Sequence, residues 1–414
     1  MPDKKKWYMW ALFLPAHFFA TYQSTIISVA GAEITGWYGI SGAVAGILAG
    51  AYFFAYAVMQ IPNGILTDRF GPRRLAAFGG IILGLAAIIF TFPVGLGNTT
   101  LLRFLTGFGA SFGFIAIMRW QSNWFSRAQF PVVSGLTAFI GNLGVIFGSG
   151  PSVYLNETIG WKNLQIVLGS ICVISSILVF FRVKDHPDKS SAGAPYPIFR
   201  AFRTLFADKR SYLSAGAFGA SFGMYTVLSS LWGAFFFIHV YGLSSCEAAS
   251  YLVFLPAGVA LGSLASGFMA RLFKGEQRAV LVLLSLANAG WGILIFLRIH
   301  NAMLWIYRPF FLLIGLCGAS SLLVYTTVSN YTPREMRGAA IAFTGFGGLF
   351  IASILQPLCG MMLDRSLQQT IGGIIKYSFS AYQKIFIMLF LINCAGVFSY
   401  WLVIKKTGLM HNTC

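Results

Sequence analysis

Acidic side chains are scarce in this chain of 414 residues, which has eleven Asp and Glu residues against 29 Lys and Arg residues. Charged residues of both signs make up only 10% of the sequence, whereas hydrophobic residues make up 57%. A water-soluble protein of this length needs far more polar surface. The composition therefore excludes a soluble globular protein and indicates an integral membrane protein.

Cysteines are also few, and their spacing matches no metal or redox motif. The six are Cys172, Cys246, Cys317, Cys359, Cys394 and Cys414. None is part of a C-x-x-C pattern and most fall inside apolar runs, so we expect packing residues rather than a disulfide framework or a metal site. The apolar runs also lack paired carboxylates, an H-E-x-x-H motif and a nucleophile–base pair. We therefore expect neither an enzyme nor a bound metal or cofactor.

The net charge of +18 comes from basic residues scattered over many short hydrophilic breaks. A nucleic-acid-binding protein would instead gather them on one polar domain. Anionic lipid headgroups are the expected partner of these residues, and nucleic acid is not.

Twelve apolar stretches reach the length of about 20 residues that a helix needs to cross a bilayer. They cover residues 7–30, 43–66, 74–93, 99–122, 131–154, 162–183, 211–239, 247–271, 278–297, 302–329, 338–363 and 382–404. The first follows three lysines, as in a signal peptide, but it is too long and lacks a small-residue cleavage site. The sequence thus predicts an all-α membrane protein with a six-helix bundle over 1–183, a linker over 184–210 and a second six-helix bundle over 211–414.

The distribution of Lys and Arg predicts the orientation of these helices. With both termini in the cytoplasm, the inner segments carry 21 of the 29 basic residues and the outer loops carry four. Basic residues are retained on the cytoplasmic side of membrane proteins. We therefore expect both termini and the 184–210 linker to be cytoplasmic.

Short patterns of the first half recur in the second half. The recurring pairs are 123–127 with 330–334, 109–111 with 318–320, Gly64 with Gly267, and Gly71 with Gly275. The offsets lie between 203 and 209 residues, which indicates a duplicated six-helix unit. Transporters built from two such repeats hold their substrate near the interface of the repeats.

The break between the second and third apolar runs concentrates charge and glycine. It contains Gly64, Asp68, Arg69, Gly71, Pro72, Arg73 and Arg74. Gly71 and Pro72 favour a sharp reversal of the chain, and the arginines would lie among headgroups. Asp68 would end a helix, where the helix dipole disfavours a negative charge, so we expect it to face a positive partner.

This pattern is similar to the loop between helices 2 and 3 of the major facilitator superfamily, with Pro72 as an insertion. The segment 52–62 also looks like the bacterial organic anion:cation symporter branch and the related phagosomal amino-acid carriers. The resemblance implies twelve helices in two pseudo-symmetric bundles, alternating access and, for Asp68, the N-terminus of helix 11 as its partner. The second half has Arg271 in the place of Asp68, so we expect this contact in the first half alone. We also expect a monomer.

Charged and amide side chains inside the apolar runs are candidates for the transport site, since burying them is costly. Arg103 is followed four residues later by glycine, which resembles the helix-4 pattern of the superfamily, and Arg308 is its counterpart in the second half. The alternative is an arginine that reaches outward to the headgroups. Gln121 falls on the Arg103 face of a straight helix, whereas Arg119 falls about 160° away. We expect Arg119 to brace Asp68 or the headgroups.

Polar side chains recur at helical spacing in the first, second and seventh runs. They include Tyr22, Gln23, Ser24, Tyr56, Gln60, Tyr225, Ser229 and Trp232. Such stripes occur as contacts between helices. Their presence in the repeat-related first and seventh runs favours a solute cavity, so all eight are candidates for substrate binding together with Arg103, Gln121 and Arg308.

No carboxylate falls in the middle of an apolar run, so candidates for proton coupling are weak. The candidates are His17, Glu33 and His239, although a buried histidine of the core is the alternative for His17. The excess of arginine over carboxylate in the runs favours an anionic or zwitterionic solute. We expect a secondary transporter of a small carboxylate or amino acid in the inner membrane. The resemblance implies an arginine on helix 1 in many anion carriers of that branch, whereas this chain has Tyr22 and Gln23 there, which disfavours an organic phosphate. The alternatives are a drug or metabolite exporter of the same fold and a membrane sensor that does not transport.

Overall fold

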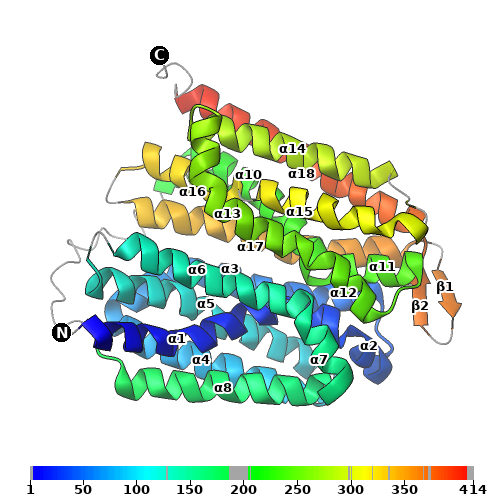
Figure 1. The fold of residues 1–414 in the computed structure, drawn as a ribbon, viewed down its shortest axis with the longest axis horizontal. Helices are drawn as coiled ribbons and strands as arrows, with labels where there is room; N and C mark the ends of the chain where they lie inside the picture. The colour runs from blue at the N-terminus through cyan, green and yellow to red at the C-terminus, as the bar shows by residue number, and fades with distance from the viewer. Residues whose placement is uncertain are drawn as a thin grey trace. The chain divides into compact units, whose positions relative to one another are not determined.

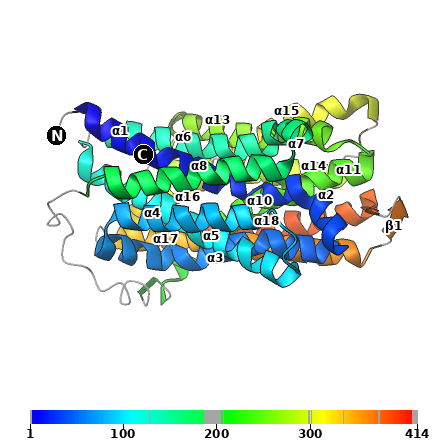
Figure 2. The ribbon, with the colours of Figure 1, turned by 90° about the horizontal axis from the view of Figure 1, so that it is seen from below.

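The computed structural model describes residues 3–126, 129–185, 204–205, 207–296, 299, 301–318, 320–333, 336–366, 368–371 and 374–407. They form two compact units, one made of Met1–Gly39 and Ala51–Pro195 and the other of Ile40–Gly50 and Tyr196–Cys414. Within each unit the long helices run alongside one another (Figures 1 and 2). Eleven helices of the described residues are long and apolar enough to cross a membrane.

The first unit is built from the N-terminal helices. They are α1 (Asp3–Gln23), α2 (Ile26–Tyr38), α3 (Gly42–Phe70, of which the first residues belong to the second unit), α4 (Pro72–Ile89), α5 (Leu96–Trp124), α6 (Phe130–Ser149), α7 (Pro151–Ile159) and α8 (Trp161–Arg182). Glycines let α4 and α5 pack backbone to backbone. A Cβ atom on Gly79 would lie 2.6 Å from the Gly109 carbonyl oxygen. Small residues at such contacts are typical of helix packing in membranes.

The second unit contains the remaining elements. They are α10 (Lys209–Val227), the π-helix η2 (Leu228–Trp232), α11 (Gly233–Tyr241), α12 (Ser245–Leu252), α13 (Phe254–Leu272), α14 (Glu276–Phe296), the 3₁₀-helix η3 (Asn301–Ile306), α15 (Tyr307–Gly318), α16 (Ser320–Tyr331), α17 (Arg337–Asp364), β1 (Gln368–Ile371), β2 (Ile374–Tyr377) and α18 (Phe379–Thr407). The strands form an antiparallel hairpin in which Gln368 pairs with Tyr377. The sequence predicted only a loop there.

The first predicted span is not one continuous helix, because it breaks into α1 and α2 at Ser24 and Thr25. The Ser24 hydroxyl donates to the Thr21 carbonyl at 2.6 Å, and the Thr25 hydroxyl donates to the Tyr22 carbonyl at 2.9 Å. Hydroxyls that bond nearby carbonyls compete with the helical hydrogen-bond ladder. The prediction of an uninterrupted helix over 7–30 was therefore wrong at this point.

The start of α3 packs closely against the end of α17 inside the second unit. A Cβ atom on Gly46 would lie 2.4 Å from the Gln356 carbonyl oxygen, and one on Gly50 would lie 2.6 Å from that of Ser353. The Asp364 carboxylate accepts hydrogen bonds from the Gly42 and Ala43 amides at 2.9 and 2.8 Å. A carboxylate at the N-terminus of a helix satisfies free amides and opposes the helix dipole, so Asp364 stabilises the start of α3.

The β-hairpin supplies a further contact at this point. The Tyr377 hydroxyl donates to Asp364 and accepts from the Gly42 amide at 3.2 Å. Burial and the adjacent Asp364 carboxylate raise the pKa of Tyr377, so its hydroxyl stays protonated and can donate. The hairpin therefore holds the carboxylate in place.

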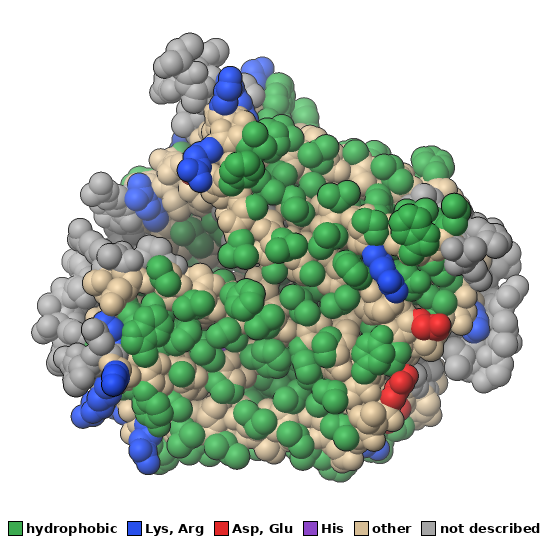
Figure 3. Space-filling model, viewed as in Figure 1, with side chains coloured by type: hydrophobic (Ala, Val, Ile, Leu, Met, Phe, Trp, Pro, Cys, Tyr) green, Lys and Arg blue, Asp and Glu red, His purple; other side chains and the backbone are tan. Residues whose placement is uncertain are grey.

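Hydrophobic side chains are spread over the whole face seen in Figure 3, with few charged side chains among them. Among the most exposed are Phe181 in α8, Leu264 in α13 and Phe296 in α14. Large apolar patches of this kind are rare on soluble monomers and are expected where helices contact lipid.

Candidate functional site

The charged break after α3 forms a compact turn in the first unit. Gly71 has a φ of 87°, a backbone angle that residues other than glycine rarely adopt. Pro72 begins α4 directly after it. Gly275, its repeat counterpart, also has a positive φ of 138°. The backbone turn therefore recurs in the second half, although Arg271 there is exposed and has replaced the acidic residue.

Asp68 forms an ion pair with Arg119 of α5, with 3.0 Å between carboxylate oxygen and Nε. This is one of the two bracing contacts that the sequence analysis left open for Arg119, the other being with the headgroups. Arg73 reaches the end of the first unit's last helix, donating to the Phe180 carbonyl at 3.2 Å and pairing with Asp185 at 3.7 Å. Gly64 is half-buried, whereas Arg69 and Arg74 are exposed at the same break. The break thus links α3 to α5 and α4 to α8.

Arg103 is fully buried, so it does not reach outward to the headgroups. Its guanidinium donates to the backbone carbonyl of Gln23 at 3.2 Å and to the Gln23 amide oxygen at 3.4 Å. Aromatic rings of Tyr52 and Phe90 lie 5.1 and 5.7 Å from the guanidinium carbon. Cation–π contacts of this kind are strong where water is excluded.

Gln23 is the last residue of α1, so Arg103 contacts the first span at its break. The Gln23 amide also donates to Gln165 of α8 at 2.9 Å. Tyr22 is buried against Phe19 and Phe147, and its hydroxyl has no hydrogen-bond partner among the described residues. Ser24 lies in the break itself. Broken helices of transporters mark the substrate site, and here the break lies beside a buried cation.

Other candidates of the first unit lie elsewhere. Gln121 is buried, but it is about 27 Å further along α5 than Arg103 and bonds Thr137 and Ser134 of α6. The structure therefore does not bring Gln121 and Arg103 together. Tyr56 and Gln60 are half-buried on α3, with Tyr56 next to Tyr52.

Two of the candidates for proton coupling, His17 and Glu33, have different surroundings. His17 is buried and stacks on Phe114. It also lines a cavity of about 20 Å³, room for a single water molecule. These contacts match the alternative interpretation of a core histidine. Glu33 is exposed on α2.

In the second unit, three candidates gather around the π-helix η2. Ser229 and Trp232 are buried within it, and Tyr225 lies one turn before Ser229 at the end of α10. The Trp232 indole donates to the Gln356 carbonyl at 3.2 Å. The sequence analysis missed Gln356, whose only signal was an amide next to Pro357 inside a long apolar run.

Arg308 is not placed like Arg103. It is exposed near the start of α15 and stacks over Tyr251 at 5.0 Å. The predicted run began at 302, but residues 301–306 form η3 and α15 begins only at Tyr307. Arg308 therefore lies at the end of its helix rather than within it.

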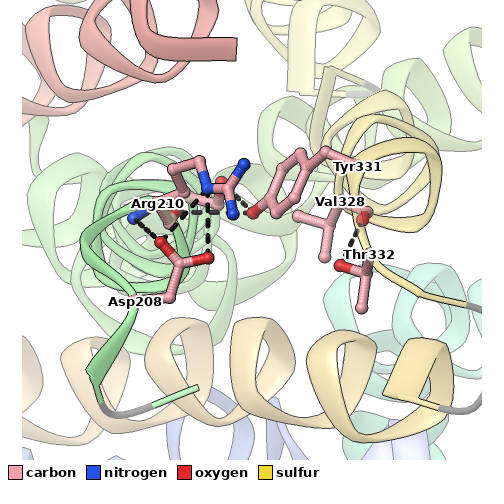
Figure 4. A network of polar contacts seen from close by, with 6 residues as sticks. Asp208, Arg210, Val328, Tyr331 and Thr332 are labelled. Atoms are coloured by element: carbon pink, nitrogen blue, oxygen red, sulfur yellow. Dashed lines mark hydrogen bonds and ion pairs between the residues drawn. The ribbon is translucent and has the colours of Figure 1, made fainter. Parts of the chain in front are cut away.

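A further polar network lies at the start of α10 (Figure 4). Asp208 accepts hydrogen bonds from the backbone and the side chain of Arg210, and the Arg210 guanidinium stacks over Tyr331 at 5.3 Å. The Tyr331 hydroxyl lies 3.0 Å from that of Ser214. These contacts cap α10 and tie it to α16, which is a structural role. Across the described residues, no group of three or more His, Cys, Asp or Glu side chains could hold a metal ion.

A family model described as "Major Facilitator Superfamily" matches residues 13–357. The chain belongs to this superfamily. The resemblance seen in the charged break is thereby confirmed, as is the fold of twelve helices in two bundles. This major facilitator protein is also similar over its whole length to a bacterial homologue of the human lysosomal transporter Spinster, with a TM-score of 0.77, 17% identity and 98% of both chains covered. A D-xylose–proton symporter gives a TM-score of 0.72 with 13% identity, over 95% of this chain and 96% of its own.

Curated relatives of this major facilitator protein are transporters. A probable sulfoacetate transporter of Cupriavidus necator is 29% identical over 175 residues, which are 42% of this chain and 41% of that protein. A probable hexose phosphate transport protein of Chlamydia pneumoniae is 22% identical over 79% of this chain and 78% of its own. A D-galactonate transporter of Escherichia coli is 29% identical over 39% of this chain and 37% of its own. Family and relatives are transporters, which confirms that the chain is not an enzyme.

Proposed function

We propose that this protein is a secondary transporter of small organic anions or zwitterions, such as carboxylates, sulfonates or amino acids, in a bacterial inner membrane. The observation that carries the proposal is the buried Arg103 guanidinium beside the break between α1 and α2. Burying a cation costs desolvation free energy unless the cation is paired. Buried cations in membrane helices mark substrate or ion pathways.

The contacts of Arg103 suit an exchangeable partner. Its bonds to Gln23 are 3.2 and 3.4 Å long, whereas a charge-assisted bond to a carboxylate is about 2.8 Å long. A guanidinium can hold a carboxylate or sulfonate through two parallel hydrogen bonds. An arriving anion would therefore gain more from Arg103 than the neutral Gln23 amide does.

The names of the relatives support an anion as well. Sulfoacetate, D-galactonate and hexose phosphate all carry a negative charge at neutral pH, and they are named for proteins that share sequence with this chain. Those proteins differ in substrate, so the relatives support the charge of the solute rather than its identity.

The test is solute counterflow in proteoliposomes that contain the purified protein. The solutes are sulfoacetate, tartrate, D-galactonate, a hexose phosphate and neutral xylose. We expect uptake of at least one anion, loss of uptake in Arg103→Gln and partial recovery in Arg103→Lys, since the ammonium keeps the charge but not the fork of donors.

The matched control is Arg308→Gln, which removes an exposed arginine of the second unit. We expect it to keep uptake within about twofold, because an exposed side chain on a helix end contributes little. Anion uptake that is equal in Arg103→Gln and the unsubstituted protein would contradict the role of Arg103. Binding of an anion without any counterflow would favour a sensor, and export of cationic drugs would favour the exporter alternative.

A further inference from the structure

The amide of Gln356 is fixed in one orientation inside the second unit. Its Nε2 donates to the Thr226 carbonyl at 3.2 Å and to the Ser230 hydroxyl. Ser230 in turn donates to Thr226 at 2.6 Å. The Thr226 carbonyl and the Ser230 hydroxyl therefore both act as acceptors, so the amide nitrogen must face them. The amide oxygen then points away from these two groups.

The oxygen of the same amide has no hydrogen-bond partner among the residues that the structure describes. Gln356 is fully buried, and its Oε1 receives no hydrogen bond from the described residues. Leaving a buried acceptor unpaired costs about 1–3 kcal/mol. The nitrogen of this amide is fixed by two hydrogen bonds and its oxygen receives none from the described residues. The oxygen is therefore suited to accept a hydrogen bond from a donor group of another molecule.

The surroundings of Gln356 depart from regular helix. The residues that hold its nitrogen lie in and just before the π-helix Leu228–Trp232, and Pro357 follows it in α17. π-helical turns occur frequently at functional sites. A proline inside a helix removes one backbone hydrogen bond.

The repeat relationship gives independent support. Ser229 and Ser230 of the π-helix lie 205 residues after Ser24 and Thr25, within the range of 203 to 209 that relates the two halves. The first span is broken at Ser24 and Thr25, and there a glutamine, Gln23, contacts Arg103. Interruptions at corresponding positions of two repeats point to a binding site in a transporter. Each half thus has an irregular helix with a buried glutamine beside it.

We propose that the Gln356 Oε1 accepts a hydrogen bond from a hydroxyl or ammonium group of the transported anion, and that it selects hydroxy acids and amino acids over analogues without the donor. This inference rests on the proposed transport of organic anions. It assigns the second unit a role in specificity, through an acceptor that carries no charge and so does not repel the anion.

The probes are two matched pairs, tartrate with succinate and alanine with propionate, and the measurement is the dissociation constant for purified protein. We expect the unsubstituted protein to bind the donor-bearing member of at least one pair about tenfold more tightly, since a site built around a hydrogen bond rejects the analogue that lacks it. In Gln356→Met, which keeps the shape but has no oxygen, we expect this preference to fall to less than about twofold, with the affinity for the donor-free member nearly unchanged.

Two controls separate this role from packing. Ser230→Ala removes a partner of the nitrogen but leaves the oxygen, so the preference should persist. Asn393→Leu removes a different buried amide of α18 whose oxygen is also unpartnered, and it should leave the preference intact.

Each outcome has one meaning. If Gln356→Met still prefers the donor-bearing solutes, the inference is overturned, because the preference then does not depend on the Gln356 oxygen. If the unsubstituted protein binds the two members of each pair with equal affinity, this inference is overturned, while the proposed transport of anions is not affected. An unsubstituted protein that binds none of the four probes and none of the anions of the counterflow panel overturns the proposed function as well.

Discussion

The carboxylate of Asp68 lies 3.0 Å from the guanidinium of Arg119. The pair joins the last turn of α3 to the end of α5 within the first unit. Both side chains are partly exposed, 53% for Asp68 and 34% for Arg119, so water and salt weaken their attraction. The pair therefore positions two helix ends more than it stabilises the fold.

We expect Asp68→Asn to impair transport while expression and ligand binding stay close to normal. An exposed ion pair contributes about 0–1 kcal/mol to stability, whereas a charge that differs in its contacts between two conformations shifts their populations. Counterflow rate and dissociation constant would be measured on the same preparation. The reciprocal variant Arg119→Gln should have a similar effect, and the double variant should add little to either. Equal losses of binding and of transport would contradict this role.

A glycine pair on α5 tests the close packing of the first unit. A Cβ atom on Gly107 would lie 2.1 Å from the Tyr52 carbonyl oxygen, whereas one on Gly113 would meet nothing within 4 Å. We expect Gly107→Ala to lower stability by about 1–3 kcal/mol, because backbone has to move. Gly113→Ala should be neutral or slightly stabilising, since alanine favours the helix. Thermal unfolding of the purified variants would measure both, and equal melting temperatures would argue against the contact.

The cap on α3 should also be measurable. Asp364→Asn removes the charge that accepts from the Gly42 and Ala43 amides, and we expect a loss of about 1–3 kcal/mol in the free energy of unfolding. Tyr377→Phe should cost less, because the carboxylate keeps its two backbone bonds. Glu157→Gln, which removes an exposed carboxylate of α7, is the control. If the melting temperatures of Asp364→Asn and Glu157→Gln agree, the cap does not contribute.

The orientation of the chain remains a prediction from its basic residues. Ser190 lies in the linker, outside the described residues, and we expect Ser190→Cys to resist a membrane-impermeant maleimide added to intact cells. Glu157→Cys, in the break predicted to face outward, should react under the same conditions. Labelling of Ser190→Cys from outside would reverse the predicted topology.

Features that depend on composition and local spacing could be predicted from the sequence. The apolar runs fix the spanning helices because a bilayer demands about 20 apolar residues. A positive partner for Asp68 followed from a carboxylate at an unfavourable helix end, but the sequence did not single out Arg119 over the N-terminus of helix 11 that the resemblance implies. The turn at Gly71 followed from glycine and proline in a short break.

Features that depend on partners distant in the sequence could not be predicted. Gln356 looked like one polar residue in an apolar run, and only the fold shows that Thr226 and Ser230 orient its amide. Arg103 and Arg308 held similar places in their runs, yet the short helix η3 moved the start of α15 and left Arg308 exposed. The contact of Tyr377 with Asp364 needed a hairpin that the apolar pattern does not reveal.

The turns at Gly71 and Gly275 carry a last consequence. Both glycines adopt a positive φ, but only the first turn is preceded by an acidic residue, because Arg271 occupies the corresponding place in the second. The positive φ of the glycine is thus shared by the two turns, whereas the charge before it is not. Raising the ionic strength should weaken the attraction between Asp68 and Arg119 at the first turn, whereas the second turn has no carboxylate in the place of Asp68 for salt to screen. The two turns therefore share a glycine with a positive φ and differ in the ion pair that salt can weaken.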